Sequence, residues 1–549
     1  MLPIRRLALL LFFFIPALLA AQTTENCTNG LDDDGDGLID CFDPECTCTG
    51  PCDSFYYTTC NAPCSYVPPC DSISLGIQWV GQAPTGTYSP LVAGDMDADG
   101  IPEIVVAQTE GPFIYIINGA TGQTKTTITA LTNFAGGTAP AIADIDNDGF
   151  GELVIVGDDR RLRAYEHTGT LKFFSFGLVG YGARYRFSVP SIADFDNNGQ
   201  PEILIGNQIF SGQNGQLIAS GGAANAAGEH PARVANNFSF AMPVAIDALP
   251  TSFCPDCAGL EIVAGNRVYS VNLNSGNITP VVTLPAPYTD GFTSVADFDR
   301  DGDLDAIVQG KKGGQNTIYV WDIQTPTVMR EFQLFTNWQE GASRANVADL
   351  DGDGELEVSF VEFPTLYALD NDFNVLWTRS TNDASSITCS SVFDFCGNGS
   401  VDVIYRGQDF LQVLDGATGQ VRWEDECRSL THIENPLVLD VDGDGQTEIV
   451  IECGLNGSYN NGTVVAYEAV GTPGIASRRV WNQHAYFNTN INDNLRVPRF
   501  QQNPHIIGDS LRMNAFLNQY FNPSFPSPDG ALTLQNFQCA GDSIDVTLQ

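Results

Sequence analysis

The stretch Asp349-Leu350-Asp351-Gly352-Asp353-Gly354-Glu355-Leu356-Glu357 decides the fold of this chain. Oxygen-bearing side chains occupy its positions 1, 3, 5 and 9, and glycine at position 6 permits a sharp turn. Ca²⁺ takes roughly six to eight oxygen ligands at about 2.3–2.6 Å, which alternate carboxylates and the backbone carbonyl of position 7 can supply. Strand-like runs at 346–348 and 358–360 flank the stretch. The pattern therefore predicts a calcium loop that joins two short strands.

The same loop recurs along the chain. Intact copies begin at Asp95, Asp144, Asp194, Asp297 and Asp440, and successive copies, eroded ones included, start 45 to 53 residues apart. One eroded copy starts at 394 and the other near 247, and a fixed period of this length predicts a propeller, a solenoid or an array. The predicted ligands, the fourth of each set through its backbone carbonyl, are Asp95, Asp97, Asp99, Ile101 and Glu103; Asp144, Asp146, Asp148, Phe150 and Glu152; Asp194, Asp196, Asn198, Gln200 and Glu202; Asp297, Asp299, Asp301, Asp303 and Asp305; Asp349, Asp351, Asp353, Glu355 and Glu357; and Asp440, Asp442, Asp444, Gln446 and Glu448.

The repeat resembles the FG-GAP/VCBS repeat of integrin α-subunit heads and many bacterial surface proteins, over roughly residues 73–470. The resemblance implies a β-propeller with Ca²⁺ in the loop between the first two strands of a blade. The residues agree with it, because each repeat holds about four strand-like runs, the number in a propeller blade. In the last repeat these runs are 435–440, 448–452 and 464–467, and a fourth is missing.

The missing strand predicts how the ring closes. Residues 77–80 precede the first loop and resemble the outer-strand runs 375–377 and 421–423. We therefore predict an all-β, eight-bladed propeller in which this N-terminal strand completes the last blade, which leaves no sheet edge open. Seven blades remain the alternative if one eroded repeat is an insertion.

The N-terminal 72 residues have a different character. Residues 1–21 combine two arginines, an apolar run and small residues, which predicts a secretory signal peptide and an exported protein without a transmembrane segment. Residues 22–72 hold eight cysteines, which predicts a disulfide-rich module and a linker in front of the propeller. Zinc binding by the cysteines is the competing interpretation.

A further calcium loop is predicted inside this module, over residues 32–43. Its oxygen spacing matches an EF-hand loop, except that aspartate replaces the usual glutamate at the last position. The stretch also resembles the repeat of bacterial MopE-type metal-binding surface proteins. The predicted ligands are Asp32, Asp34, Asp36, Leu38, Asp40 and Asp43.

Cysteines within the repeats predict three structural crosslinks. Cys254 and Cys257 are expected to staple a loop insertion, with a redox dithiol as the alternative that lacks a βαβ context. Cys389 and Cys396 flank the first strand of the seventh repeat, where a disulfide would replace the metal. Cys427 and Cys453 are expected to join the last two blades near the closure.

The C-terminal part departs from the repeat. Residues 471–534 are locally basic and aromatic, which favours a strap or linker against the propeller, or a ligand-binding patch. Residues 535–549 look like the start of a secreted β-sandwich domain, and the chain is then a fragment or has lost that domain.

Charge and composition narrow the function. The chain has 66 acidic and 25 basic residues, which disfavours nucleic-acid binding and places much of the acid in metal loops. The five histidines stand apart and no phosphate-binding glycine loop occurs, so the sequence predicts no enzyme. By resemblance we expect a cell-surface module for adhesion to a protein or glycan. A calcium-dependent polysaccharide lyase of the rhamnogalacturonan lyase type is the alternative, a quinone-dependent dehydrogenase is rejected, and the oligomeric state stays open.

Overall fold

The computed structural model describes residues 73–134, 137–180, 189–222, 225–231, 240–335, 341–396, 400–470, 475–501, 504, 506–507, 510–511, 516–519, 534–540 and 543–548. The chain forms two compact units, one of residues 68–532 and one of residues 1–67 with 533–549. In the latter, β35 (Leu534–Ala540) and β36 (Ser543–Leu548) form an antiparallel hairpin. The predicted signal peptide and cysteine-rich module, with its calcium loop at 32–43, lie outside the described residues.

The repeating unit of the larger body is a four-stranded antiparallel sheet, or blade. In blade 6 the strands run in sequence order from β22 (Asn346–Ala348) through β23 (Glu357–Glu362) and β24 (Thr365–Leu369) to β25 (Val375–Ser380). The stretch 349–357 links the first two strands, as predicted. The first two strands are buried along their whole length, whereas in the outer strand β25 only Trp377 is buried. The first two strands are thus covered on both faces, and the outer strand is open to solvent at the edge of the ring.

The other blades repeat this plan with short, buried inner strands. Their strands are β2 (Leu91–Gly94), β3 (Glu103–Ala107), β4 (Phe113–Asn118) and β5 (Thr124–Thr129) in blade 1; β6 (Ala141–Ala143), β7 (Glu152–Val156), β8 (Leu162–Tyr165) and β9 (Leu171–Phe174) in blade 2; β10 (Ser191–Ala193), β11 (Glu202–Ile205), β12 (Gln208–Ser211) and β13 (Leu217–Ser220) in blade 3; β14 (Val244–Ile246), β15 (Glu261–Ala264), β16 (Arg267–Asn272) and β17 (Asn277–Thr283) in blade 4; β18 (Phe292–Ala296), β19 (Asp305–Lys312), β20 (Gln315–Asp322) and β21 (Thr327–Gln333) in blade 5; and β26 (Ser391–Phe393), β27 (Asp402–Arg406), β28 (Phe410–Asp415) and β29 (Val421–Glu426) in blade 7.

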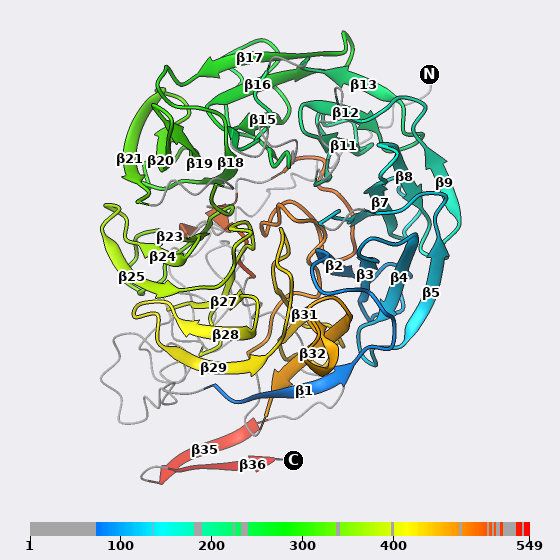
Figure 1. The fold of residues 1–549 in the computed structure, drawn as a ribbon, viewed down its shortest axis with the longest axis vertical. Coiled ribbons are helices and arrows are strands. Elements are labelled where there is room, and N and C mark those ends of the chain that lie inside the picture. The colour runs from blue at the N-terminus through cyan, green and yellow to red at the C-terminus, as the bar shows by residue number, and fades with distance from the viewer. Residues whose placement is uncertain are drawn as a thin grey trace, which may run out of the picture. The chain divides into compact units, whose positions relative to one another are not determined.

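Blade 8 closes the ring with the two ends of the repeat region. Its strands are β30 (Leu437–Leu439), β31 (Glu448–Gly454), β32 (Gly462–Ala469) and, as the outer strand, β1 (Leu75–Val80), which pairs antiparallel with β32. Each innermost strand contacts the innermost strand of the next blade, and β30 contacts β2, so the circle is complete (Figure 1). The predicted all-β propeller and its closure by the N-terminal strand are confirmed. Among the described strands the ring consists of six four-stranded sheets and one eight-stranded sheet, in which β13 and β17, the outer strands of what we number blades 3 and 4, pair through Ser220 and Asn277.

The seam between blades 7 and 8 carries additional links. A disulfide joins Cys427 to Cys453, as predicted, and the buried guanidinium of Arg406 pairs with the buried carboxylate of Glu434. Arg406 also donates 2.9 and 3.0 Å hydrogen bonds to the carbonyl oxygens of Thr87, in front of blade 1, and Glu452. These contacts tie the last blades to the first by covalent and charged links as well as by strand pairing.

The predicted Cys389–Cys396 disulfide is wrong. Cys389 is a buried free thiol, whereas Cys396 is disulfide-bonded to another cysteine. The two residues lie on opposite sides of β26, and an extended strand advances about 3.3 Å per residue. Their Cα atoms are therefore kept farther apart than the roughly 7 Å that a disulfide spans. The expected Cys254–Cys257 disulfide is present in the insertion of blade 4.

A C-terminal segment crosses the centre of the ring. We call residues 475–501 and 516–519 the strap; they run through the middle of the view in Figure 1. Trp481 exchanges 2.9 and 2.8 Å backbone hydrogen bonds with Ala93 of β2, and Phe516 pairs in the same way with Val347 of β22. Trp481 and Tyr486 stack, fully buried, with ring centroids 4.6 Å apart. The strap is thus part of the core that the innermost strands surround.

Candidate metal centres

Each intact loop is organised by its own carboxylates, as the blade 6 loop shows. Asp349 accepts backbone N–H bonds from Gly352 (2.7 Å) and Gly354 (3.2 Å), and Asp351 accepts one from Asp353 (3.2 Å). Both glycines have positive φ values, 79° and 96°, a conformation that glycine adopts more readily than other residues. Glu357, at position 9, accepts the N–H of the residue after Asp349 at 2.7 Å. The turn is therefore shaped by side chains whose remaining lone pairs stay available.

The bond from position 9 back to position 2 is common to all six intact loops. The acceptors are Glu103, Glu152, Glu202, Asp305, Glu357 and Glu448, at donor–acceptor distances between 2.7 and 3.0 Å. These six side chains are buried, as is the position 1 side chain in the loops of blades 2, 3, 5, 6 and 8, while most acids at positions 3 and 5 lie nearer the surface. Each loop therefore has a buried acidic floor and an accessible acidic rim.

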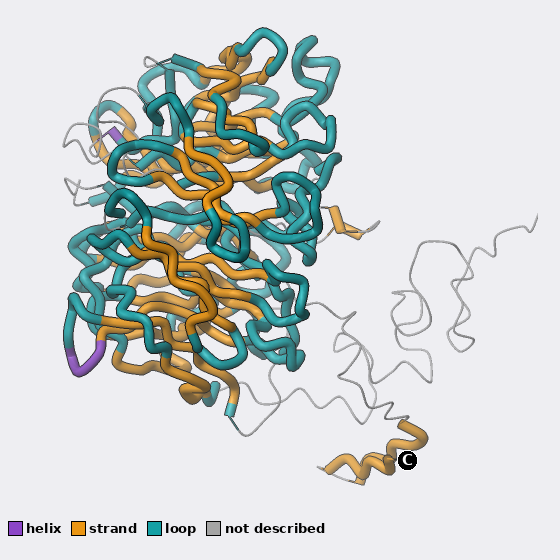
Figure 2. Tube along the Cα trace, turned by 90° about the vertical axis from the view of Figure 1, so that its right-hand side faces the viewer, coloured by secondary structure: helices purple, strands orange, loops and turns teal. Residues whose placement is uncertain are grey.

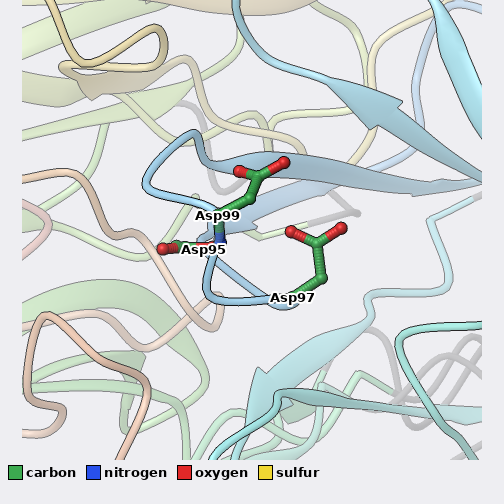
Figure 3. A group of neighbouring side chains, drawn as sticks. All are labelled: Asp95, Asp97 and Asp99. Carbon is green, nitrogen blue, oxygen red and sulfur yellow. Dashed lines mark hydrogen bonds between the residues drawn. The ribbon is translucent and has the colours of Figure 1, made fainter.

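The carboxylates of one loop lie close together. In blade 1, one oxygen from each of Asp95, Asp97 and Asp99 falls within a 4.8 Å group, and Figure 3 shows the three side chains on one tight turn. Equivalent groups form in other loops, namely Asp144, Asp146 and Glu152; Asp194, Asp196 and Glu202; and Asp297, Asp299 and Asp305. The predicted side-chain ligands at these positions are thus gathered by the fold.

The donor set fits a hard divalent cation. In the groups formed by the described residues of blades 1, 2, 3 and 5, the converging atoms are carboxylate oxygens, the ligand type that Ca²⁺ prefers, rather than the sulfur and imidazole ligands typical of zinc. Glu448 is fully buried, and its Oε1 atom has no hydrogen-bond partner among the described residues. Bound Ca²⁺ would satisfy such an oxygen and neutralise the carboxylates around it.

Burial raises the pKa of every position 9 acid. The pKa of Glu103 is raised to about 7, those of Glu202 and Glu152 to about 8, that of Glu357 to about 9 and that of Glu448 to about 10, in each case chiefly because the side chain is removed from water. Neighbouring carboxylates of the same loop raise the values further. The negative charge of these loops is costly unless a cation accompanies it.

The position 7 residues are placed by their backbone. Their N–H groups donate to the side chain of position 5 at 2.7 to 3.1 Å, which holds the turn. The residues are Ile101, Phe150, Gln200, Asp303, Glu355 and Gln446. Metal binding by their carbonyl oxygens stays a prediction, as does binding by Asp32, Asp34, Asp36, Leu38, Asp40 and Asp43, which lie outside the described residues.

In the two eroded loops the position 9 acid is held by protein groups rather than by a set of converging carboxylates. In blade 7 the buried Asp402 lies 3.0 Å from Nη1 of Arg422, which also donates to Asp415. In blade 4 the buried Glu261 accepts two backbone N–H bonds of 3.0 Å, and the Cys254–Cys257 disulfide closes the insertion. Each loop keeps its buried acid and holds it by a different partner.

Sequence spacing did not identify the basic residues that reach the loops. Lys125 places its Nζ 2.6 Å from Asp97 and 2.7 Å from Glu103, beside a cavity of about 320 Å³. From the strap, Arg479 lies 3.1 Å from Asp440 and donates to the carbonyl oxygen of Gly443 at 2.8 Å. Each contact joins residues that are well separated in sequence. The one signal in the sequence is a lysine at the second position of an outer strand, as in Lys125 of β5 and Lys172 of β9.

Arg344, His484 and Cys389 form a buried group in the centre of the ring, and their contacts indicate a structural role. Arg344 lies 3.2 Å from Nδ1 of His484, whose Nε2 is 2.8 Å from the carbonyl oxygen of Ile433. Burial lowers the pKa of His484 to about 3 and raises that of the Cys389 thiol to about 12. A nucleophilic cysteine needs an accessible thiolate, and Cys389 is a buried neutral thiol.

Comparisons with known proteins agree with this architecture. Residues 95–155 match the FG-GAP-like repeat, which spans the first calcium-type loop and the start of blade 2. The biofilm matrix protein Bap1 of V. cholerae has a similar structure, with a TM-score of 0.61 and 17% identity over 82% of this chain and 99% of that one. The exotype rhamnogalacturonan lyase YesX gives a TM-score of 0.49 and 14% identity, over 72% of this chain and 74% of that one. No curated protein matches this sequence.

Among the described residues, no helix is long and apolar enough to cross a membrane.

Proposed function

We propose that this chain, a β-propeller with an FG-GAP-like repeat, is an exported calcium-binding protein that serves as an adhesion or ligand-binding module for a protein or glycan. The observation that carries the calcium part is the repeated loop in which buried and rim carboxylates converge within 4.8 Å. The residues that would hold the ions are the acids at positions 1, 3, 5 and 9. Bound Ca²⁺ would neutralise each loop and fix the turn between the first two strands of its blade.

Export is supported by the crosslinks. Disulfides at Cys254–Cys257 and Cys427–Cys453 persist in oxidising compartments and are rare in the cytosol. The sequence of residues 1–21 supports the same conclusion.

The ligand-binding part rests on how the two faces of the ring differ. Loops gather on both sides of the strands (Figure 2). Antiparallel strands place successive turns on alternate faces, so the calcium-type loops of the blades share one face and the connections from one blade to the next share the other. Those connections carry exposed apolar side chains, including Leu131 (94% exposed), Phe176 (87%) and Phe335 (80%). Large exposed apolar side chains at loop tips favour contact with a partner.

The first experiment measures bound metal and ligand together. We expect purified full-length protein to contain calcium by mass spectrometry and to bind a set of glycans or surface proteins on arrays when Ca²⁺ is present. Phe176→Ser and Phe335→Ser should weaken that binding without changing the melting temperature, whereas the exposed control Phe500→Ser on the strap should not. Absence of bound calcium would refute the metal assignment, and release of unsaturated sugars from pectic polymers would replace adhesion with lyase activity.

A further inference from the structure

Every outer strand of the propeller carries one β-bulge at the same place. In each blade, the pairing between the third and fourth strands skips one residue of the fourth strand, at the same register relative to the strand that follows the loop. Because a bulge inserts an extra residue and re-aims its side chain, the skipped residues form an equivalent set. They are Lys125, Lys172, Ile218, Val281, Met329, Leu376, Arg422 and Gln78 in blades 1 to 8.

In four consecutive blades the bulge residue is polar and reaches the loop of its own blade. Lys125 contacts acids at positions 3, 5 and 9 of the blade 1 loop, at 2.6, 3.1 and 2.7 Å. Lys172 contacts positions 3 and 9 of the blade 2 loop at 2.5 and 3.4 Å, together with Glu166 at 3.0 Å. The amide of Gln78 donates to Asp442 of blade 8 at 2.7 Å.

Blade 7 shows what a basic bulge residue does when the loop is eroded. Arg422 lies 3.0 Å from the buried position 9 acid Asp402, and the Sγ atom of Cys396 accepts a 2.9 Å hydrogen bond from it. Positions 3 and 5 of this loop are Cys396 and Asn398, so two of the expected carboxylates are absent from the sequence. A guanidinium there neutralises the acid that remains.

In the other four blades the bulge residue is apolar. Ile218, Val281, Met329 and Leu376 are partly buried against neighbouring apolar clusters and have no donor to offer a carboxylate. Blade 4 has no intact loop, but the loops of blades 5 and 6 have acids at positions 1, 3, 5 and 9, and the blade 3 loop has acids at positions 1, 3 and 9 with Asn198 at position 5. Near them, Arg499 donates to a backbone oxygen at Asn197, and Arg300 lies 3.7 Å from Glu355 on the exposed rim, where an ion pair contributes little.

We propose that the bulge residue sets how strongly each loop depends on a bound cation, and that Lys125 and Lys172 are cations built into the loops of blades 1 and 2. An incoming Ca²⁺ must displace an ammonium group that already holds two or three of its ligands. The fourth strands of blades 3, 5 and 6 contain no lysine, so they supply no ammonium group to these loops, and Arg330 of the blade 5 strand is paired with Asp372 at 3.1 Å. This inference rests on the proposed calcium binding and divides the loops into two affinity classes.

The test exchanges bulge residues between the classes in the full-length protein. Lys125→Met and Lys172→Met should each add about one tightly bound Ca²⁺ per chain, measured by equilibrium dialysis at low free calcium and mass spectrometry. Leu376→Lys should remove about one, because it places an ammonium group in the blade 6 loop. Lys312→Met is the matched control, since Lys312 pairs with Glu331, 2.6 Å away and outside the loops, and should change nothing.

A second readout separates a change in binding from a folding defect. In chelator, Lys125→Met should lower the melting temperature and added Ca²⁺ should restore it, whereas Leu376→Lys should raise the melting temperature in chelator. Calcium binding by the wild type with no change in any exchange variant would overturn this inference and leave the proposed function standing. No calcium bound by the wild type or by either Lys→Met variant would overturn both.

Discussion

Blades 7, 8, 1 and 2 and blades 3 to 6 share one backbone plan and differ in where the positive charge at their loops comes from. The first group, which we call the seam half, takes it from the protein, through Arg422, Arg479, Lys125 and Lys172. The second has apolar bulge residues instead, and because we expect its intact loops to depend on a bound cation we call it the metal-dependent half. The seam half also holds the Cys427–Cys453 disulfide and the strand that closes the ring. A repeat can therefore keep its loop while the source of countercharge changes from blade to blade.

The largest expected effect is removal of calcium. Each ion bound at a concentration 100-fold above its Kd stabilises the fold by about 2.7 kcal/mol, so loss of several ions should lower the melting temperature strongly. The unfolding should begin in the metal-dependent half. Arg300 is exposed at position 4 of the blade 5 loop, and trypsin should cleave after it in chelator and spare it in Ca²⁺.

If trypsin in chelator cleaves the seam half first while Arg300 stays protected, the seam half is the part that depends more on calcium, contrary to our expectation. The measurement is a time course of tryptic fragments by mass spectrometry with and without chelator. Arg428, 33% exposed on the seam side and paired with Glu426, serves as the internal reference.

The next effect concerns the disulfide of the seam half. A double Cys427→Ala, Cys453→Ala variant opens a crosslink between residues 26 positions apart and should lose about 3 kcal/mol of unfolding free energy. Because the seam half supplies its own cations, the loss should be similar with and without Ca²⁺. Denaturant titrations with and without Ca²⁺ measure this loss. A loss of unfolding free energy seen only in chelator would show that the stability of the seam half also depends on bound metal.

The smallest effect is a pH dependence at the same seam. Burial raises the pKa of Glu452 from its ordinary value to about 7. A carboxyl whose pKa is higher in the folded state favours folding at low pH, and that contribution is lost as the pH rises through about 7. From pH 5 to pH 8 the wild type should lose about 2 kcal/mol from this group. Glu452→Gln should show a flatter profile over that range in thermal melts, and an unchanged profile would assign the pH dependence elsewhere.

Much of this architecture could be predicted from spacing alone. The repeat period predicts the loop at 349–357, the closing strand at 77–80 and the Cys427–Cys453 crosslink. Each of them depends on a local sequence pattern or on comparing one repeat with the next. The prediction of a Cys389–Cys396 disulfide was wrong because the two residues are close in sequence but are separated by the extended strand β26. The reach of Lys125 into its loop depends on a bulge and on pairing register, which no single-sequence pattern reveals.

The pairing of β1 with β32 also governs the order in which the molecule can assemble. Leu75 pairs with Ala469, so the first strand of the ring to leave the ribosome must wait for a partner encoded almost 400 residues later. Contacts between such distant segments slow folding, and a strand without its neighbour is a template for aggregation until then. Completion of the circle is thus a late event in folding, because it needs both ends of the repeat region to be present.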